Sequence, residues 1–122
     1  MRTILFIEDE PTLQKLVGSF LEKEGYQVIS ALDGEAGLKL AKTMKPDLIL
    51  LDLILPRKDG FTVLEEIKKD EAVKNIPVII LTNLEGSGDV EKALSLGATT
   101  YLVKANYELE EVVKKIKETL RE

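Results

Sequence analysis

Residues 48–52 read Leu48-Ile49-Leu50-Leu51-Asp52, four aliphatic side chains followed at once by a carboxylate. An apolar run without polar alternation is typical of a parallel strand that is covered on both faces. Four further short apolar runs lie along the chain, at residues 4–7, 26–29, 78–81 and 101–103. The run at 26–29 contains Gln27, which predicts that this strand lies at an edge of the sheet.

Segments with helical periodicity separate these runs. Apolar side chains in the first segment recur at i, i+3, i+4, i+7 and i+8, which predicts a helix over about residues 11–24. Further helices are predicted over about residues 33–44, 61–69, 87–96 and 109–120. Strands and helices that alternate in this way predict an α/β fold, a doubly wound parallel sheet in a single domain over residues 1–122.

The composition excludes several kinds of site. Of the 122 residues none is Cys and none is His, so disulfides, thiolate or imidazole metal sites and a Ser-His-Asp triad are ruled out. The net charge of −5 argues against nucleic acid or an anionic membrane as the main partner. No apolar run approaches the ~18 residues of a membrane-spanning helix. With no signal peptide indicated, a cytoplasmic location is expected.

Polar side chains follow the predicted strands at the edge where functional groups gather in doubly wound sheets. These side chains are Glu8, Asp9, Glu10, Asp52, Thr82 and Lys104. Each alone has an ordinary explanation, as a helix cap, a turn residue or a solvated charge. Their coincidence on four strand ends favours a shared chemistry.

Carboxylates that crowd together resist ionisation unless a cation compensates them. Oxygen ligands without His or Cys favour Mg²⁺ or another hard divalent ion. A lysine and a hydroxyl facing such an ion would neutralise and orient an incoming phosphoryl group. The strand ends therefore predict a phosphoryl-binding metal site.

The motifs resemble, in order and spacing, the receiver domain of two-component response regulators, such as the single-domain chemotaxis receivers. They are Glu8-Asp9-Glu10, Asp52-Leu-Ile-Leu-Pro56 with Asp59-Gly60, Leu81-Thr82, and Gly97-Ala98 leading to Tyr101-Leu-Val-Lys104. The resemblance covers essentially the whole chain. It implies a flavodoxin-like (βα)5 sandwich with strand order 2-1-3-4-5, in which Asp9 and Asp52 become neighbours.

The resemblance also implies phosphorelay signalling. Asp52 would take a phosphoryl group from a sensor histidine kinase or a phosphotransfer protein, and the modified domain would act on a downstream protein target. The chain would be a self-phosphorylating and self-dephosphorylating acceptor and not a turnover enzyme. Asp9, Asp52 and the backbone carbonyl of Ile54 would bind Mg²⁺ or Mn²⁺, with Glu8 acting through a water molecule.

Three further residues receive roles from the resemblance. Lys104 would pair with Asp52 and then with a phosphoryl oxygen, as a compact positive charge. The hydroxyl of Thr82 would swing in to hydrogen-bond another phosphoryl oxygen. Tyr101 matches the aromatic side chain that turns inward when that threonine moves, although simple packing at the sheet edge is an alternative.

Some positions depart from the pattern of the family, including Glu8, where many relatives have Asp. Ala105 replaces a proline that commonly follows a cis bond, so the Lys104–Ala105 bond is expected to be trans with Lys104 displaced, or strained in place. Asn83 stands where the family prefers a small residue, which narrows the access to Asp52.

Ile54 and Leu84 would flank the approach of water to Asp52, by resemblance to positions that are polar in fast-decaying relatives. Both are bulky and apolar. Neither offers a hydrogen bond that could orient the water, so a long-lived phosphorylated state is expected.

Two other functions remain as alternatives. An interaction module of receiver fold could work without phosphorylation. A phosphotransferase similar to the haloacid dehalogenases would need a second acid two places after Asp52, where Ile54 stands. A monomer is expected, because Thr99-Thr100 and Glu110-Glu111-Val112 replace the charge pairs that join dimeric transcription-factor receivers. From the net charge, no direct contact with nucleic acid or a membrane is expected.

Overall fold

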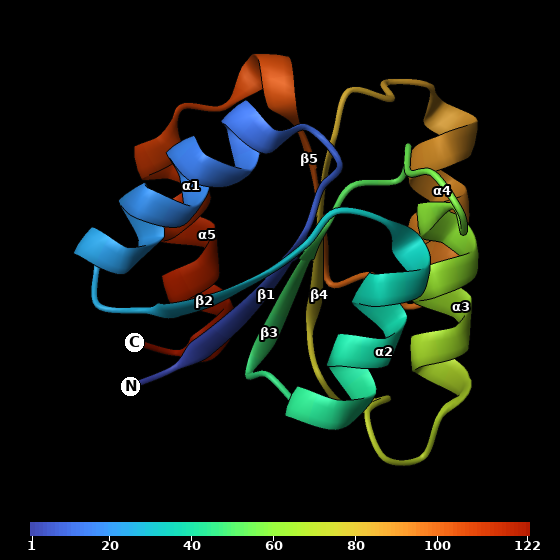
Figure 1. The fold of residues 1–122 in the computed structure, drawn as a ribbon. Helices are drawn as coiled ribbons and strands as arrows, with labels where there is room; N and C mark the ends of the chain where they lie inside the picture. The colour runs from blue at the N-terminus through green and yellow to red at the C-terminus, as the bar shows by residue number, and fades with distance from the viewer.

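Five parallel strands form one sheet in the order β2-β1-β3-β4-β5 in the computed structural model, which describes all 122 residues (Figure 1). The strands are β1 (Thr3–Ile7), β2 (Gln27–Ala31), β3 (Leu48–Leu51), β4 (Val78–Thr82) and β5 (Thr100–Val103). The order is the one that the resemblance implies. The interrupted strand, β2, lies at an edge, as Gln27 predicts.

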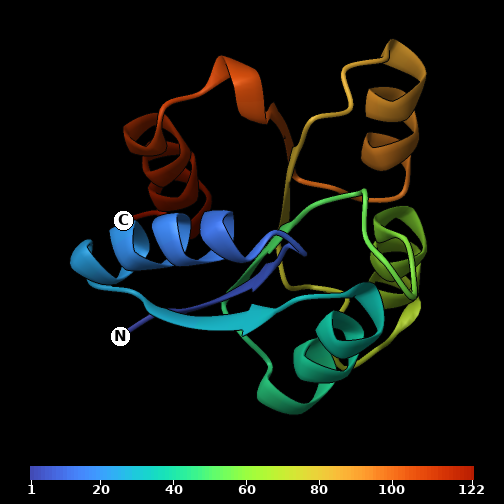
Figure 2. The ribbon, with the colours of Figure 1, turned by 45° about the horizontal axis from the view of Figure 1, so that its top comes forward.

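Helices cover both faces of this sheet (Figures 1 and 2). They are α1 (Pro11–Lys23), α2 (Gly34–Met44), α3 (Gly60–Lys69), α4 (Ser87–Ser95) and α5 (Leu109–Leu120), with a short 3₁₀ helix, η1 (Lys104–Asn106), before α5. Helices α1 and α5 lie on one face, whereas α2, α3 and α4 lie on the other. This arrangement confirms the predicted doubly wound fold, and each helix lies within a residue or two of its predicted range.

Alternate side chains of the inner strands enter two separate cores. Ile4 and Phe6 of β1 join a cluster with buried residues of α1 and α5, which we call the α1–α5 core. Leu5 and Ile7 join a cluster with residues of α2, α3 and α4, which we call the α2–α4 core. All four side chains are fully buried. Two apolar environments explain why β1 and β3 show no polar alternation.

Acidic residues fix the starts of three helices. The Glu10 carboxylate accepts hydrogen bonds from the backbone N–H groups of Thr12 (3.0 Å) and Leu13 (2.9 Å), directly before Pro11 at the first helical position. Asp33 and Asp59 cap α2 and α3 in the same way. For Glu10, the ordinary explanation as a helix cap is therefore confirmed.

The start of α3 packs directly on the backbone at the end of β3. The N–H of Gly60 donates to the carbonyl of Leu53 at 2.9 Å. A Cβ atom on Gly60 would lie 2.4 Å from the Asp52 carbonyl oxygen and 2.4 Å from the Leu53 Cα. Only glycine permits this approach, which holds the backbone of Asp52 against α3.

We expect Gly60→Ala to lower the free energy of unfolding by about 3 kcal/mol, because the new methyl group meets backbone atoms that have no free space. Gly88→Ala, within α4, is the matched control, because a Cβ there meets nothing within 4 Å. The control should be neutral or stabilising by up to about 1 kcal/mol, from the higher helix propensity of alanine. Urea denaturation of both variants measures the difference, and equal effects would contradict the packing argument.

Candidate functional site

A cleft of about 350 Å³ opens at the carboxyl ends of the central strands. Its lining includes Glu8, Asp9, Asp52, Asn83 and Lys104. Parallel pairing sets the position of the acids, because Ile7 lies opposite Leu51 and the next residues are Glu8 and Asp52. The register of β1 and β3 thus joins residues that are far apart in the sequence.

Three carboxylates converge in this cleft. Glu8, Asp9 and Asp52 each place one carboxylate oxygen within 4.8 Å of the others. Glu8 and Asp52 are buried, at 1% and 4% exposure, whereas Asp9 is exposed to solvent. The donor set consists of hard oxygens only, which fits a small divalent cation such as Mg²⁺.

Lys104 lies between the two buried acids. Its Nζ is 2.5 Å from Glu8 Oε1 and 2.9 Å from Asp52 Oδ2. Burial opposes the charge on this ammonium, but the hydrogen bonds to Glu8 and Asp52 outweigh burial and raise the pKa of Lys104. For Glu8 the balance is the reverse. Burial raises the pKa of this carboxyl and outweighs the hydrogen bonds from Lys104 and the Glu10 N–H, which lower it.

The peptide bond between Lys104 and Ala105 is trans, like every other bond in the chain. Of the two expected outcomes, a trans bond with Lys104 displaced or a bond strained in place, the structure shows the trans bond, with Lys104 in contact with both acids. Because η1 begins at Lys104, the backbone turns there while the side chain still reaches both acids. The flexible stem of a lysine allows this contact without the proline.

Thr82 and Tyr101 contact the same peptide segment. Thr82, at the end of β4, is fully buried, and its Oγ1 lies 3.5 Å from the backbone nitrogen of Leu84. The Tyr101 hydroxyl donates to the Leu84 carbonyl oxygen at 2.9 Å. Burial is the main cause that raises the pKa of Tyr101. Tyr101 also packs against the α2–α4 core, as the alternative of simple packing expects, and its inward turn with Thr82 stays a prediction.

The residues expected to control access to Asp52 do not all face it. Ile54, at 53% exposure, and Asn83 line the cleft. Leu84 is not among the lining residues, because its side chain packs against the α2–α4 core. Leu13 and Ile54 are the apolar residues that line the cleft, and the expectation that Leu84 flanks the approach of water stays a prediction.

Gln14 was missed by sequence reasoning. It lies in α1 at 6% exposure, and its Nε2 is within hydrogen-bond distance of the carbonyl oxygens of Phe6, Glu8 and Ala31. Its position in the sequence indicates burial, because it precedes Val17 by three residues and Leu21 by seven, on the buried stripe of the helix. A polar residue on such a stripe requires an explanation.

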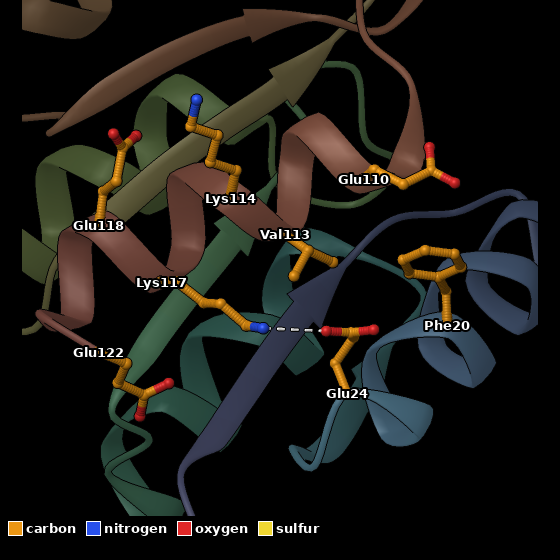
Figure 3. Close-up of a pocket in the computed structure, with 8 residues that line it drawn as sticks. All are labelled: Phe20, Glu24, Glu110, Val113, Lys114, Lys117, Glu118 and Glu122. Carbon is orange, nitrogen blue, oxygen red and sulfur yellow. Dashed lines mark hydrogen bonds and ion pairs between the residues drawn. The ribbon is translucent and has the colours of Figure 1, made fainter.

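A second cavity, of about 380 Å³, lies between α1 and α5 (Figure 3). Phe20 and Val113 form its apolar part, and an ion pair between Lys117 and Glu24 crosses it at 3.0 Å. Charged groups of both signs line this cavity, without the convergence of acids seen at the strand ends.

The helices of the structure are all too short or too polar to cross a membrane.

Comparisons with known proteins agree with this geometry. The response regulator receiver domain family matches residues 4–117. The DNA-binding dual master transcriptional regulator RpaA of Synechocystis sp. is 42% identical over 121 residues, which are 99% of this chain and 50% of RpaA. Protein PilH of Pseudomonas aeruginosa is 38% identical over 104 residues, which are 85% of this chain and 86% of PilH. The chain spans about half the length of the transcriptional regulators that it matches.

A solved structure shows the same fold with a metal in place. The receiver domain of the sensor histidine kinase PA1611 from Pseudomonas aeruginosa, described with a magnesium ion coordinated in its active site cleft, has a TM-score of 0.87 and 32% identity. The match covers 96% of this chain and 95% of that one. The strand order, the acidic cleft and the family match together show that this chain belongs to the receiver domains of two-component response regulators, which are signalling modules and not turnover enzymes in general.

Proposed function

We propose that residues 1–122 form one receiver domain that accepts a phosphoryl group on Asp52 from the phosphohistidine of a sensor kinase or phosphotransfer protein. The observation that carries the proposal is the position of Asp52, which is buried beside Glu8 and Asp9 and held by Lys104 at 2.9 Å. Glu8 is the other acid that combines burial, the carboxylate cluster and a lysine partner, and the resemblance of the Asp52 motif to the receiver family assigns the phosphoryl group to Asp52.

In the proposed transfer, a carboxylate oxygen of Asp52 attacks phosphorus while the nitrogen–phosphorus bond of the donor breaks. The electron pair of that bond stays on the leaving imidazole. Lys104 keeps a positive charge beside the reacting oxygens, because its pKa is raised and it is protonated at neutral pH. The N–H of Ile54, which donates to Asp52 Oδ1 at 3.2 Å, orients the carboxylate. These groups are preorganised, as charge stabilisation in phosphoryl transfer requires.

A divalent cation fits the same cleft. Asp9, Asp52 and the carbonyl of Ile54 would hold Mg²⁺ or Mn²⁺, which supplies positive charge to the phosphoryl oxygens. Glu8 would act through a water molecule, with its carboxylate held by hydrogen bonds from Lys104 and from the Glu10 N–H. The magnesium ion in the cleft of the PA1611 receiver supports this assignment.

The signal would leave the site through Thr82 and Tyr101. A phosphoryl group on Asp52 would offer the Thr82 hydroxyl a charged acceptor in place of its long contact with the Leu84 N–H. Because Tyr101 is hydrogen-bonded to the carbonyl of the same residue, movement of this segment would also change the surface near α4. That surface would bind the downstream protein.

Incubation with acetyl phosphate and Mg²⁺ should add one phosphoryl group at Asp52, detected by intact mass. Asp52→Asn should remain unmodified, and excess EDTA should prevent the reaction of the parent. Asp33→Asn is the matched control, since it changes an acid that caps α2 and should leave the modification unaffected. An unmodified parent would contradict the proposal and favour a module that works without phosphorylation. Equal labelling of Asp52→Asn would also contradict it, because the phosphoryl group would then lie on another residue.

Loss of the phosphoryl group should be slow, and Ile54→Asn should accelerate it by about tenfold because an amide can orient the attacking water. Leu16→Asn makes the same exchange at a similarly exposed position of α1 outside the cleft, at 55% exposure. Phosphate release from the phosphorylated proteins measures both rates. An Ile54→Asn rate equal to that of the parent would show that the apolar wall does not control water.

The domain should remain a monomer, or at most a weak dimer, after phosphorylation. The basis is the absence of charge pairs at Thr99-Thr100 and Glu110-Glu111-Val112. Light scattering at micromolar concentration, with and without acetyl phosphate, tests this expectation. A tight dimer in the phosphorylated sample would refute it.

A further inference from the structure

The buried amide of Gln14 joins three backbone segments. Its Nε2 lies 2.9 Å from the Phe6 carbonyl oxygen, 3.1 Å from that of Glu8 and 2.8 Å from that of Ala31. The first two belong to the end of β1 and the loop that follows it, and the third ends β2. One side chain of α1 thus holds together the strand ends next to the acidic cleft.

Glu8 is held at all of its polar groups. Its N–H donates to the carbonyl oxygen of Ala31 at 3.0 Å, and its carbonyl oxygen accepts from Nε2 of Gln14. In its carboxylate, Oε1 accepts from Lys104 and Oε2 accepts from the N–H of Glu10 at 3.0 Å. The residues on both sides of Asp9 are therefore held by hydrogen bonds, whereas Asp9 itself is exposed.

The amide of Gln14 carries a cost that space-filling does not explain. Its Oε1 is the only buried side-chain nitrogen or oxygen of the protein without a hydrogen-bond partner. An apolar side chain on this stripe of α1 would avoid that cost. What an apolar side chain would not supply is a donor to the three carbonyl groups.

We propose that Gln14 is a positioning residue for the acidic site, which fixes the Glu8–Glu10 loop so that Asp9 faces Asp52 before any cation arrives. The inference rests on the proposed function in one respect, the use of Asp9 to bind a divalent cation. Groups that orient metal ligands from behind commonly change metal affinity by about tenfold or more when they are removed.

Gln14→Met tests this role, because methionine has a similar length and no charge and lacks the amide. We expect the affinity of the intact chain for Mn²⁺, measured by electron paramagnetic resonance, to fall by about tenfold. We also expect the N–H of Glu10 to exchange faster with solvent in the metal-free protein, measured by NMR. If Gln14→Met does not fold, Gln14→Asn withdraws the amide by one methylene group and should have the same two effects.

Leu21→Ala is the control, because it removes a buried side chain from the same helix at the end far from the acids. It should lower stability but leave the Mn²⁺ affinity and the exchange of the Glu10 N–H within about twofold of the parent. Gln14 variants that lose stability with both readouts unchanged would overturn the inference and leave Gln14 a purely structural role. If the parent itself binds no Mn²⁺, the proposed cation site fails, and the exchange of the Glu10 N–H alone decides the role of Gln14.

Discussion

The contact of one ammonium group with two buried carboxylates is the interaction on which the rest of the site depends. Glu8 and Asp52 lie side by side at almost complete burial, where two negative charges would repel each other strongly. Lys104 reduces this repulsion through short hydrogen bonds to both acids. The chain needs three strand ends at one height for this contact, and the parallel register of β1, β3, β4 and β5 provides them. The register of the sheet therefore determines whether the charged groups of the site can meet.

Leu84 illustrates how a backbone segment can matter more than its side chain. The side chain packs against the α2–α4 core, whereas its backbone N–H contacts Thr82 and its backbone carbonyl accepts from Tyr101. The adjoining helix, α4, buries only Ala93, so it is anchored less firmly than its neighbours. A cation–π contact also joins α4 to α3, because the ammonium of Lys92 lies 4.4 Å from the centre of the Phe61 ring. A weakly anchored helix beside the Thr82 contact is a suitable element for transmitting a local change.

Most of the fold could be predicted from the sequence, because continuous apolar runs, helical stripes and acids at strand ends are local signals. Asp52 and Lys104 could be predicted as a pair once their strands were placed in one sheet. Side-chain direction could not be predicted. The apolar character of Leu84 fits a cleft wall and a core equally well, and the reach of Lys104 from a trans backbone depends on rotamers that no pattern encodes. Gln14 was overlooked because its partners are backbone carbonyls, which carry no sequence signature.

The sheet separates the α1–α5 core from the α2–α4 core completely, since the two clusters share no side chain. Free-energy changes from substitutions add when the residues are distant and have no common partners. Stabilising changes found independently on the two faces can therefore be combined with little epistasis. The central strands are the exception, because neighbouring residues such as Leu5 and Phe6 belong to opposite cores and share one backbone.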